Sequence, residues 1–108
     1  MISGMRWTSE DRLGNPIYLT EERWRHIVDR HREMRGHEED LKECIRHGSR
    51  KQDPLNPQNY KYTKYFPDLP GRNTIIVGIV LFKFRETETG EVVQNNFLAT
   101  AYQKARRR

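Results

Sequence analysis

The stretch Thr74-Ile-Ile-Val-Gly-Ile-Val-Leu-Phe-Lys-Phe-Arg85 decides the fold class of this chain. β-Branched and aromatic residues dominate it, and such residues favour an extended backbone. Successive side chains of a strand point to opposite faces, which gives two apolar sets: Ile75, Val77, Ile79 and Leu81, and then Ile76, Val80, Phe82 and Phe84. A strand that is apolar on both faces is typical of the centre of a sheet. We therefore expect Thr74–Arg85 to be a long central strand.

Segments on both sides of this stretch supply its neighbours. Downstream, Glu86–Glu91 has the composition of a hairpin loop around Gly90, and Val92–Tyr102 is the expected partner strand. Upstream, the aromatic-rich Tyr60–Phe66 and the short Ser49–Gln52 are further strands, separated by loops that contain proline. The expected result is an antiparallel sheet of about four strands.

Two helices are expected ahead of this sheet. Thr20 is a typical N-cap residue, and helical spacing of apolar residues continues from Thr20 to Met34, with Gly36 beyond the end. A second helix is expected over Glu38–His47, with Gly48 in the position of a C′ glycine. Two shorter extended candidates precede the helices, Met5–Thr8 and Ile17–Leu19. The predicted fold class is α+β, with two N-terminal helices packed on the antiparallel sheet.

A chain of 108 residues is expected to form one domain. Its net charge of +5 is concentrated at one end, because +4 of it comes from Lys104, Arg106, Arg107 and Arg108. We therefore divide the chain into a single domain, residues 1–103, and a basic C-terminal tail, residues 104–108. The tail would either bind phosphates by releasing counterions or be a solvated end.

Location and redox environment follow from three features. No signal-peptide pattern is visible, and the longest apolar run, Ile75–Phe82, is far too short to span a bilayer. The single cysteine, Cys44, excludes an internal disulfide and any multi-cysteine metal site. A cytoplasmic protein without membrane contact is expected.

The first predicted helix carries the most informative titratable group. At about 100° per residue, His31 falls between Ile27 and Val28, on the face that begins at Trp24. It is also close to the helix C-terminus, where the dipole favours an imidazolium. Such a histidine either fills the core or acts as a general acid or base. A helix that buries Trp24 and Ile27 would bury His31 as well, unless its last turn overhangs the edge of the sheet.

Cations and tyrosines alternate over the predicted strands before Thr74. The cations are Arg46, Arg50, Lys51, Lys61 and Lys64, the rings are Tyr60, Tyr62 and Tyr65, and Asp53 is the one acid among them. Cations bind phosphates and rings stack on bases, a combination typical of surfaces that bind single-stranded nucleic acid. In the alternative interpretation, tyrosines are ordinary strand formers and lysines protect a sheet edge.

The last predicted strand has two unlike faces. Phe97, Ala99 and Ala101 are suited to packing under helices, whereas the other face carries Gln94, Asn96, Leu98, Thr100 and Tyr102. This row of amide, hydroxyl and phenol groups is either a second part of a substrate surface or an exposed polar face.

The spacing of the histidines does not favour a metal site. His26 and His31 lie roughly 140° apart around a helix, and the chain has neither a His-x-x-x-His pair nor a cysteine cluster. No glycine-rich phosphate loop or nucleotide fingerprint occurs either, so we expect no metal and no cofactor. A histidine, a carboxylate, cations and hydroxyls suit RNA cleavage, in which the 2′-hydroxyl of the RNA is the nucleophile.

The helix sequence Trp24-Arg-His26-Ile27, followed by Arg30-His31 and Glu33-Met34, resembles a known signature. It is similar to the phage- and toxin-associated nuclease-like domains of the barnase–EndoU–colicin–RelE group. The start of the strand at Ser49–Pro54 and the closing Thr100-Ala101-Tyr102 are similar as well, and the likeness covers most of residues 17–103. It implies a helix-then-sheet domain that cleaves RNA on its open sheet face.

The resemblance also implies roles for individual residues. His26 and His31 match the two helix histidines, and Thr100 and Tyr102 match the closing motif, which gives a catalytic set. Arg50, Lys51 and Lys64 match cations that bind the substrate, and Tyr62 joins them on the tyrosine-rich strand. Arg32 stands where the family has proline, which would favour ending the helix. With arginine the helix is free to run on, and a continuous helix places Glu33 nearly opposite His31.

Three functions remain open at this point. The first is a small metal-independent endoribonuclease, such as a toxin or a phage-derived effector, with His31 as acid or base. The second is a non-catalytic RNA-binding module that uses the same basic and aromatic face. The third is a protein-interaction domain of a toxin–antitoxin pair, whose partner is an antitoxin or immunity protein.

Overall fold

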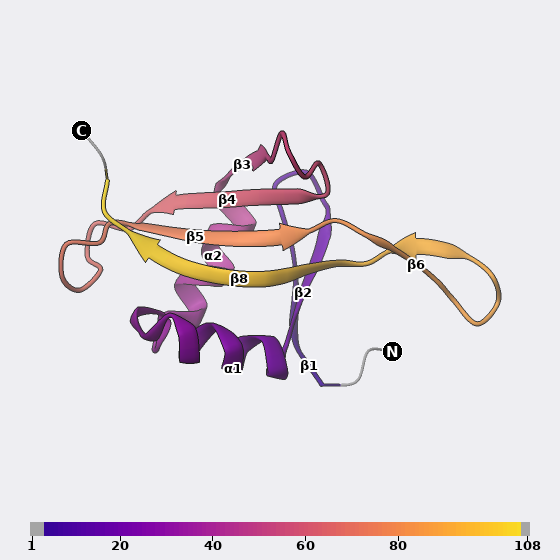
Figure 1. Ribbon diagram of the computed structural model, residues 1–108, viewed down its shortest axis with the longest axis horizontal. Helices are drawn as coiled ribbons and strands as arrows, with labels where there is room; N and C mark the ends of the chain where they lie inside the picture. Colours follow the sequence, from indigo (N-terminus) through magenta and orange to yellow (C-terminus); the bar gives the residue numbers. More distant parts are fainter. Residues whose placement is uncertain (1–3, 107–108) are drawn as a thin grey trace.

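β5 (Ile75–Leu81) lies between β4 and β8 in the main sheet, as its two apolar faces predict. The computed structural model describes residues 4–106 (Figure 1). In chain order the elements are β1 (Met5–Glu10), β2 (Pro16–Thr20), α1 (Glu21–Arg30), the 3-10 helix η1 (Arg32–Met34), α2 (Glu38–His47), β3 (Ser49–Gln52), β4 (Asn59–Tyr65), β5, β6 (Phe84–Glu86), β7 (Val92–Gln94) and β8 (Asn96–Lys104). The predicted α+β class is confirmed.

The main sheet has six strands in the order β1-β2-β8-β5-β4-β3, which corrects the expectation of about four. Neighbouring strands are antiparallel except β2 and β8, which run parallel and pair through Ile17–Asn96 and Tyr18–Phe97. The sheet is therefore mixed. The extra strands are the two short N-terminal candidates, and they join the sheet through a long-range pairing that local sequence patterns do not show.

The long strands predicted over Thr74–Arg85 and Val92–Tyr102 are each interrupted. The N–H of Phe82 still donates to the carbonyl oxygen of Gln58 at 2.7 Å, but β5 ends at Leu81 and the next strand begins at Phe84 in a different sheet. β6 and β7 then pair with each other as a separate two-stranded sheet. They form an arm, residues 83–95, that projects beyond the end of the main sheet in Figure 1.

A β-bulge decides which side chains of β8 face the core. The pairing of β8 with β5 shifts between two positions, where Ile79 pairs with Thr100 and Val80 pairs with Leu98. Ala99 therefore has no partner in β5, and Leu98 and Ala101 point to the same, buried side. The expectation that Phe97, Ala99 and Ala101 share the core-facing side is wrong for this reason.

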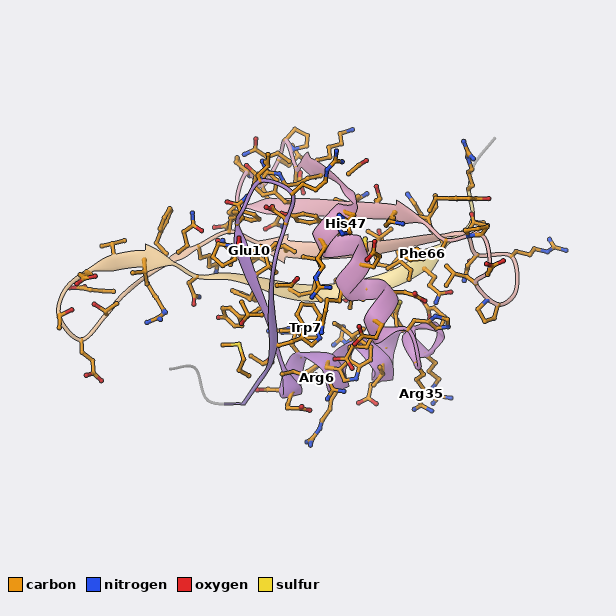
Figure 2. The ribbon with its side chains drawn as sticks, turned by 180° about the vertical axis from the view of Figure 1, so that it is seen from behind. Arg6, Trp7, Glu10, Arg35, His47 and Phe66 are labelled. Carbon is orange, nitrogen blue, oxygen red and sulfur yellow. The ribbon has the colours of Figure 1, made fainter. Side chains whose placement is uncertain are left out.

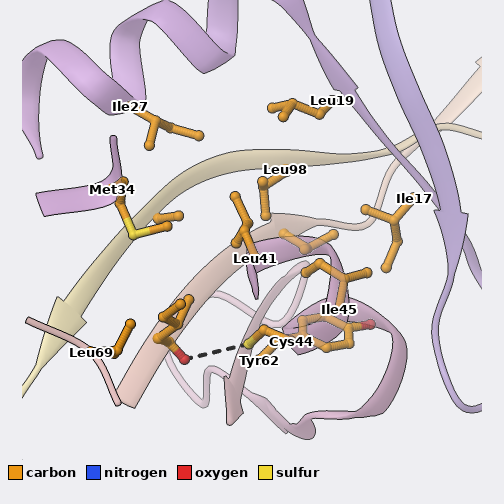
Figure 3. Close-up of a cluster of buried hydrophobic side chains, with 13 residues drawn as sticks. Ile17, Leu19, Ile27, Met34, Leu41, Cys44, Ile45, Tyr62, Leu69 and Leu98 are labelled. Atoms are coloured by element: carbon orange, nitrogen blue, oxygen red, sulfur yellow. Dashed lines mark hydrogen bonds between the residues drawn. The ribbon is translucent and has the colours of Figure 1, made fainter. Parts of the chain in front are cut away.

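The core lies on one side of the main sheet. In Figure 1, α2 crosses behind β4 and β5 while α1 runs beside β8, and Figure 3 shows the side chains between them. The buried cluster comprises Ile17, Leu19, Ile27, Met34, Leu41, Cys44, Ile45, Tyr62, Leu69, Ile76, Val80, Leu98 and Ala101.

Burial raises the pKa of the Cys44 thiol to about 12, which leaves it unreactive. Within residues 4–106, no helix is long and apolar enough to cross a membrane.

Arg6 on β1 connects the N-termini of both helices. Its guanidinium pairs with the Glu38 carboxylate of α2 and, at 2.9 Å, with the Glu21 carboxylate of α1. The indole N–H of Trp7 also donates to Glu38 at 2.9 Å, and Figure 2 shows both side chains beside the helices. The Arg6 guanidinium holds the pKa of Glu38 below its usual range. This network anchors the β1–β2 hairpin over the helices.

Candidate active site at the edge of the open sheet face

α1 ends at Arg30, four residues earlier than its apolar spacing predicts. His31 is the C-cap, with φ −128° and ψ 77°, and its N–H donates to the Ile27 carbonyl oxygen at 2.7 Å. η1 then turns the chain through Glu33. Because the helix does not continue, the Glu33 carboxylate lies on the same side as His31, and Nδ1 of His31 is 3.7 Å from Oε2 of Glu33. A continuous helix would have placed Glu33 nearly opposite His31, and the structure does not show that separation.

His31 also contacts the last strand of the sheet. Its imidazole lies over the phenol ring of Tyr102 in β8, with ring centroids 5.7 Å apart and an interplanar angle of 38°. β2 pairs with β8 only at Asn96 and Phe97, so beside Tyr102 the edge of β8 opposite β5 carries no strand. The side chain of His31 is 32% exposed, and Ile27 is the one buried residue of α1. The last turn of α1 thus overhangs the sheet edge, and His31 is not a core residue.

Gln103 holds this arrangement in place. Its side-chain Nε2 donates to the Glu33 carbonyl oxygen at 2.7 Å, and its backbone N–H donates to Oε2 of Glu33 at 3.3 Å. Oε1 of Gln103 in turn accepts from Nδ2 of Asn73 at 3.3 Å. Sequence reasoning missed Gln103, because its alternation in β8 only places it on the core side and says nothing of its partner in η1.

Strand register defines an open face on the side of the sheet away from α2. In each row across the strands, paired residues share a face: Thr100, Ile79, Lys61 and Lys51 form one row, Tyr102, Val77, Thr63 and Ser49 the next, and Lys104, Ile75 and Tyr65 the third. These eleven residues are the open face, which looks towards the reader in Figure 1. They include three lysines and no acid, so the face is electropositive; Lys104 lies one row from Tyr102, whereas Lys51 and Lys61 lie on the far strands β3 and β4.

Tyr62 is not a surface residue, which corrects its expected role in binding a substrate. It is 1% exposed, and its hydroxyl donates to Oδ2 of Asp11 at 2.6 Å. Burial and this hydrogen bond raise the pKa of Tyr62. For Asp11, burial favours the neutral acid, but hydrogen bonds from Tyr62 and Asn15 outweigh it and lower the pKa of the carboxyl. The pair joins the β1–β2 turn to β4 and has a structural role.

The other expected binding residues divide between the two faces. Lys51 lies on the open face, whereas Arg50 and Lys64 project to the opposite side of the sheet. There the Arg50 guanidinium lies 4.3 Å from the centroid of the Tyr60 ring, and the Lys64 ammonium lies 4.7 Å from that of Phe66. These cations cover aromatic rings near the sheet edge.

His26 lies away from the His31 cluster. It is exposed on the outer side of α1, in a shallow depression that it shares with Glu22, Arg25 and Asp29. Nothing in residues 4–106 joins it to His31 by a hydrogen bond or ion pair. Of the predicted catalytic set, the structure therefore brings His31 to Tyr102, places Thr100 two residues before Tyr102 on the same face of β8, and leaves His26 apart.

The basic tail begins within the sheet. Lys104 is the last residue of β8 and pairs with Ile75, and the Arg106 guanidinium lies 5.7 Å from the centroid of the Tyr65 ring. Both cations therefore extend the charge of the open face. Arg107 and Arg108 lie outside the described residues.

Comparison with known proteins identifies no relative of this chain. No protein-family model, curated protein or solved structure matches the chain. The likeness to the nuclease group therefore stays a prediction from sequence.

Proposed function

We propose that this protein is a metal-independent endoribonuclease whose active site lies at the edge of the open face. The observation that carries the proposal is the convergence of His31, Glu33 and Tyr102 from three elements, α1, η1 and β8. A partly exposed histidine whose Nδ1 lies 3.7 Å from a carboxylate oxygen is suited to act as a general acid or base. Its ring contacts Tyr102, which belongs to the electropositive open face on which we place the RNA strand.

The proposed reaction needs nothing besides the RNA and the protein. The 2′-oxygen attacks the adjacent phosphorus and loses its proton, the bond from phosphorus to the 5′-oxygen breaks, and the 5′-oxygen gains a proton. The products are a 2′,3′-cyclic phosphate and a 5′-hydroxyl end. His31 exchanges protons with these oxygens, and Glu33 orients its ring. The hydroxyls of Thr100 and Tyr102 hydrogen-bond the phosphate oxygens as negative charge builds up.

The open face suits a single-stranded substrate. Lys51, Lys61 and Lys104 supply positive charge along it, and Tyr65, which is 51% exposed, supplies a ring for stacking. Stacking on exposed rings combined with cations that follow the backbone is how proteins hold unpaired RNA. The second half of β8 leads from this surface directly to His31.

The test is cleavage of a 5′-labelled RNA in EDTA by the wild type and by His31→Ala. We expect the substitution to slow cleavage at least about 100-fold, the usual contribution of a general acid or base, and Glu33→Gln to have a smaller effect. His26→Ala is the matched control and should cleave like the wild type. A substrate with a single 2′-deoxy residue at the cleavage position should remain intact.

Other outcomes identify the alternatives. Unchanged cleavage by His31→Ala would remove this histidine from the mechanism. If neither protein cleaves RNA but both bind it in a salt-sensitive way, the protein is an RNA-binding module. If neither binds RNA at low salt, the basic face is better explained by an acidic protein partner, such as an antitoxin or immunity protein.

A further inference from the structure

A pocket opens at the end of the open face that is farthest from His31. Its volume is about 290 Å³, and its walls include Lys51, Asp53, Asn59, Lys61 and Ile79. This volume is at the lower end of the range for sites that bind small molecules. Ile79 and the two lysines belong to the row that begins at Thr100, so the pocket continues the surface proposed to bind RNA.

The loop between β3 and β4 forms the pocket wall in advance. Oδ1 of Asp53 accepts from the backbone N–H of Leu55 at 2.9 Å and of Asn56 at 3.4 Å. The backbone N–H of Asp53 donates to the Asn59 carbonyl oxygen at 2.9 Å, which closes the loop. Both Asp53 bonds use one carboxylate oxygen. Within residues 4–106 its other oxygen, Oδ2, accepts no hydrogen bond, so it is available to a ligand.

Asn59 has an unmet hydrogen-bonding requirement at the same pocket. Its Oδ1 is buried and has no donor within the described residues, and an unpaired buried acceptor is destabilising. A half-turn about the Cβ–Cγ bond exchanges the amide oxygen and nitrogen, which would turn the oxygen out of its buried position and towards the pocket. A ligand with N–H groups would supply the donor that the protein does not.

The two lysines show a second unmet requirement. Lys51 and Lys61 are directly paired across β3 and β4 and point to the same face. Like charges in this position repel each other, and an anion bound between them would reverse the effect. The pocket thus combines acceptors at the β3–β4 loop with a place for an anion on the sheet.

We propose that this pocket binds one nucleotide of the RNA and selects its base. The phosphate lies between Lys51 and Lys61, and the base packs on Ile79. An exocyclic amino group of the base donates to Asn59 and to the free oxygen of Asp53. Adenine and cytosine carry such a group, whereas uracil presents carbonyl oxygens at the corresponding position. Adenine and cytosine are therefore preferred over uracil.

This inference rests on the proposed function, because it makes the pocket a specificity site of the nuclease. Three strand spacings of about 4.8 Å separate β3 from β8. A bound nucleotide at the pocket is therefore about 14 Å from Thr100 along the row, a distance that a few nucleotides of one extended strand can span.

The test uses nucleotide binding in the His31→Ala protein, in which RNA is not consumed. Titration calorimetry with 5′-AMP, 5′-CMP, 5′-UMP and ribose 5-phosphate should give affinities for AMP and CMP at least about fivefold higher than for UMP. Asn59→Ala should remove this preference. Lys61→Ala, at an exposed position, should weaken the binding of all three nucleotides, and Arg12→Ala is the control cation outside the open face.

Each contrary result is informative. Equal affinity for ribose 5-phosphate and the nucleotides would overturn base selection and leave an anion site. An absence of nucleotide binding, together with RNA cleavage by the wild type, would overturn the pocket and leave the nuclease. Base-selective binding without any RNA cleavage would retain the pocket and overturn the nuclease.

Discussion

The hydrogen bond between Tyr62 and Asp11 is where a single residue links distant parts of the chain. It places a carboxylate that is 8% exposed against a phenol that is 1% exposed. Burying both groups is unfavourable unless they satisfy each other. Asn15 and the backbone of Leu13 donate to the same carboxylate. The pair therefore fixes the β1–β2 turn against β4.

Tyr62→Phe removes only the hydroxyl, and we expect the free energy of unfolding to fall by about 1–3 kcal/mol at pH 7. The pKa of Asp11 is lowered in the folded protein, so its contribution is complete above the unfolded pKa of about 4 and is lost as the pH falls through the folded value. Urea unfolding at pH 7 and pH 3 should show the difference between variant and wild type shrinking in acid. Tyr65→Phe, at an exposed ring, is the control; a constant difference would contradict the assignment.

Glycine is required at position 48 for a different physical reason than the sequence suggests. The sequence suggests a left-handed C′ glycine, but φ is −73°, which any residue adopts. A Cβ at this position would overlap the carbonyl oxygens of Cys44 and Thr63. Glycine is required because two backbone segments approach each other, and this approach depends on how α2 packs on β4.

At the scale of elements, the break between α1 and η1 builds the site. Apolar periodicity continues through Met34, and Met34 is indeed buried, so the periodicity alone does not show that the helix stops. Met34 reaches the core from η1 instead. The break changes the direction of Glu33, and Gln103 of β8 then holds Glu33 in place.

Because the chain turns at His31, proline should be accepted at position 32. Arg32 is the first residue of η1, where a missing N–H is tolerated. We expect Arg32→Pro to change the midpoint of thermal unfolding by only a few degrees, whereas Asp29→Pro, inside α1, should cost about 3 kcal/mol or more. Circular dichroism melts of the two variants make the comparison. Equal losses would indicate that α1 continues through position 32 in solution.

At the scale of the whole molecule, function depends on how charge is distributed over the two faces of the sheet. Helices cover one face of the sheet. Tyr62 and Arg50, which were expected to bind RNA, project to that covered face. The open face keeps Lys51, Lys61 and Lys104. For RNA binding, the absence of acidic residues from the open face therefore matters more than the net charge of +5 of the whole chain.

Salt dependence of RNA binding tests this distribution. For single-stranded RNA the slope of log affinity against log salt is about −0.7 for each phosphate neutralised. Lys51→Ala should make the slope shallower by about 0.7, whereas Arg25→Ala, an exposed cation on the outside of α1, should leave it unchanged. Fluorescence anisotropy of a labelled RNA in the His31→Ala protein measures both. The same slope in all three proteins would place the RNA elsewhere.

Local propensity and hydrophobic periodicity account for the α+β class, the N-cap at Thr20, the limits of α2 and β3 and the central position of β5, so these could be predicted from the amino-acid sequence. Long-range packing accounts for the pairing of the β1–β2 hairpin with the sheet, the bulge that turns Leu98 inward, and the burial of Tyr62 on Asp11. It also decided the state of His31. Periodicity places this histidine on the apolar face of α1, but the position of that helix at the uncovered edge of β8 is a long-range packing outcome, and it leaves the ring exposed beside Glu33 and Tyr102.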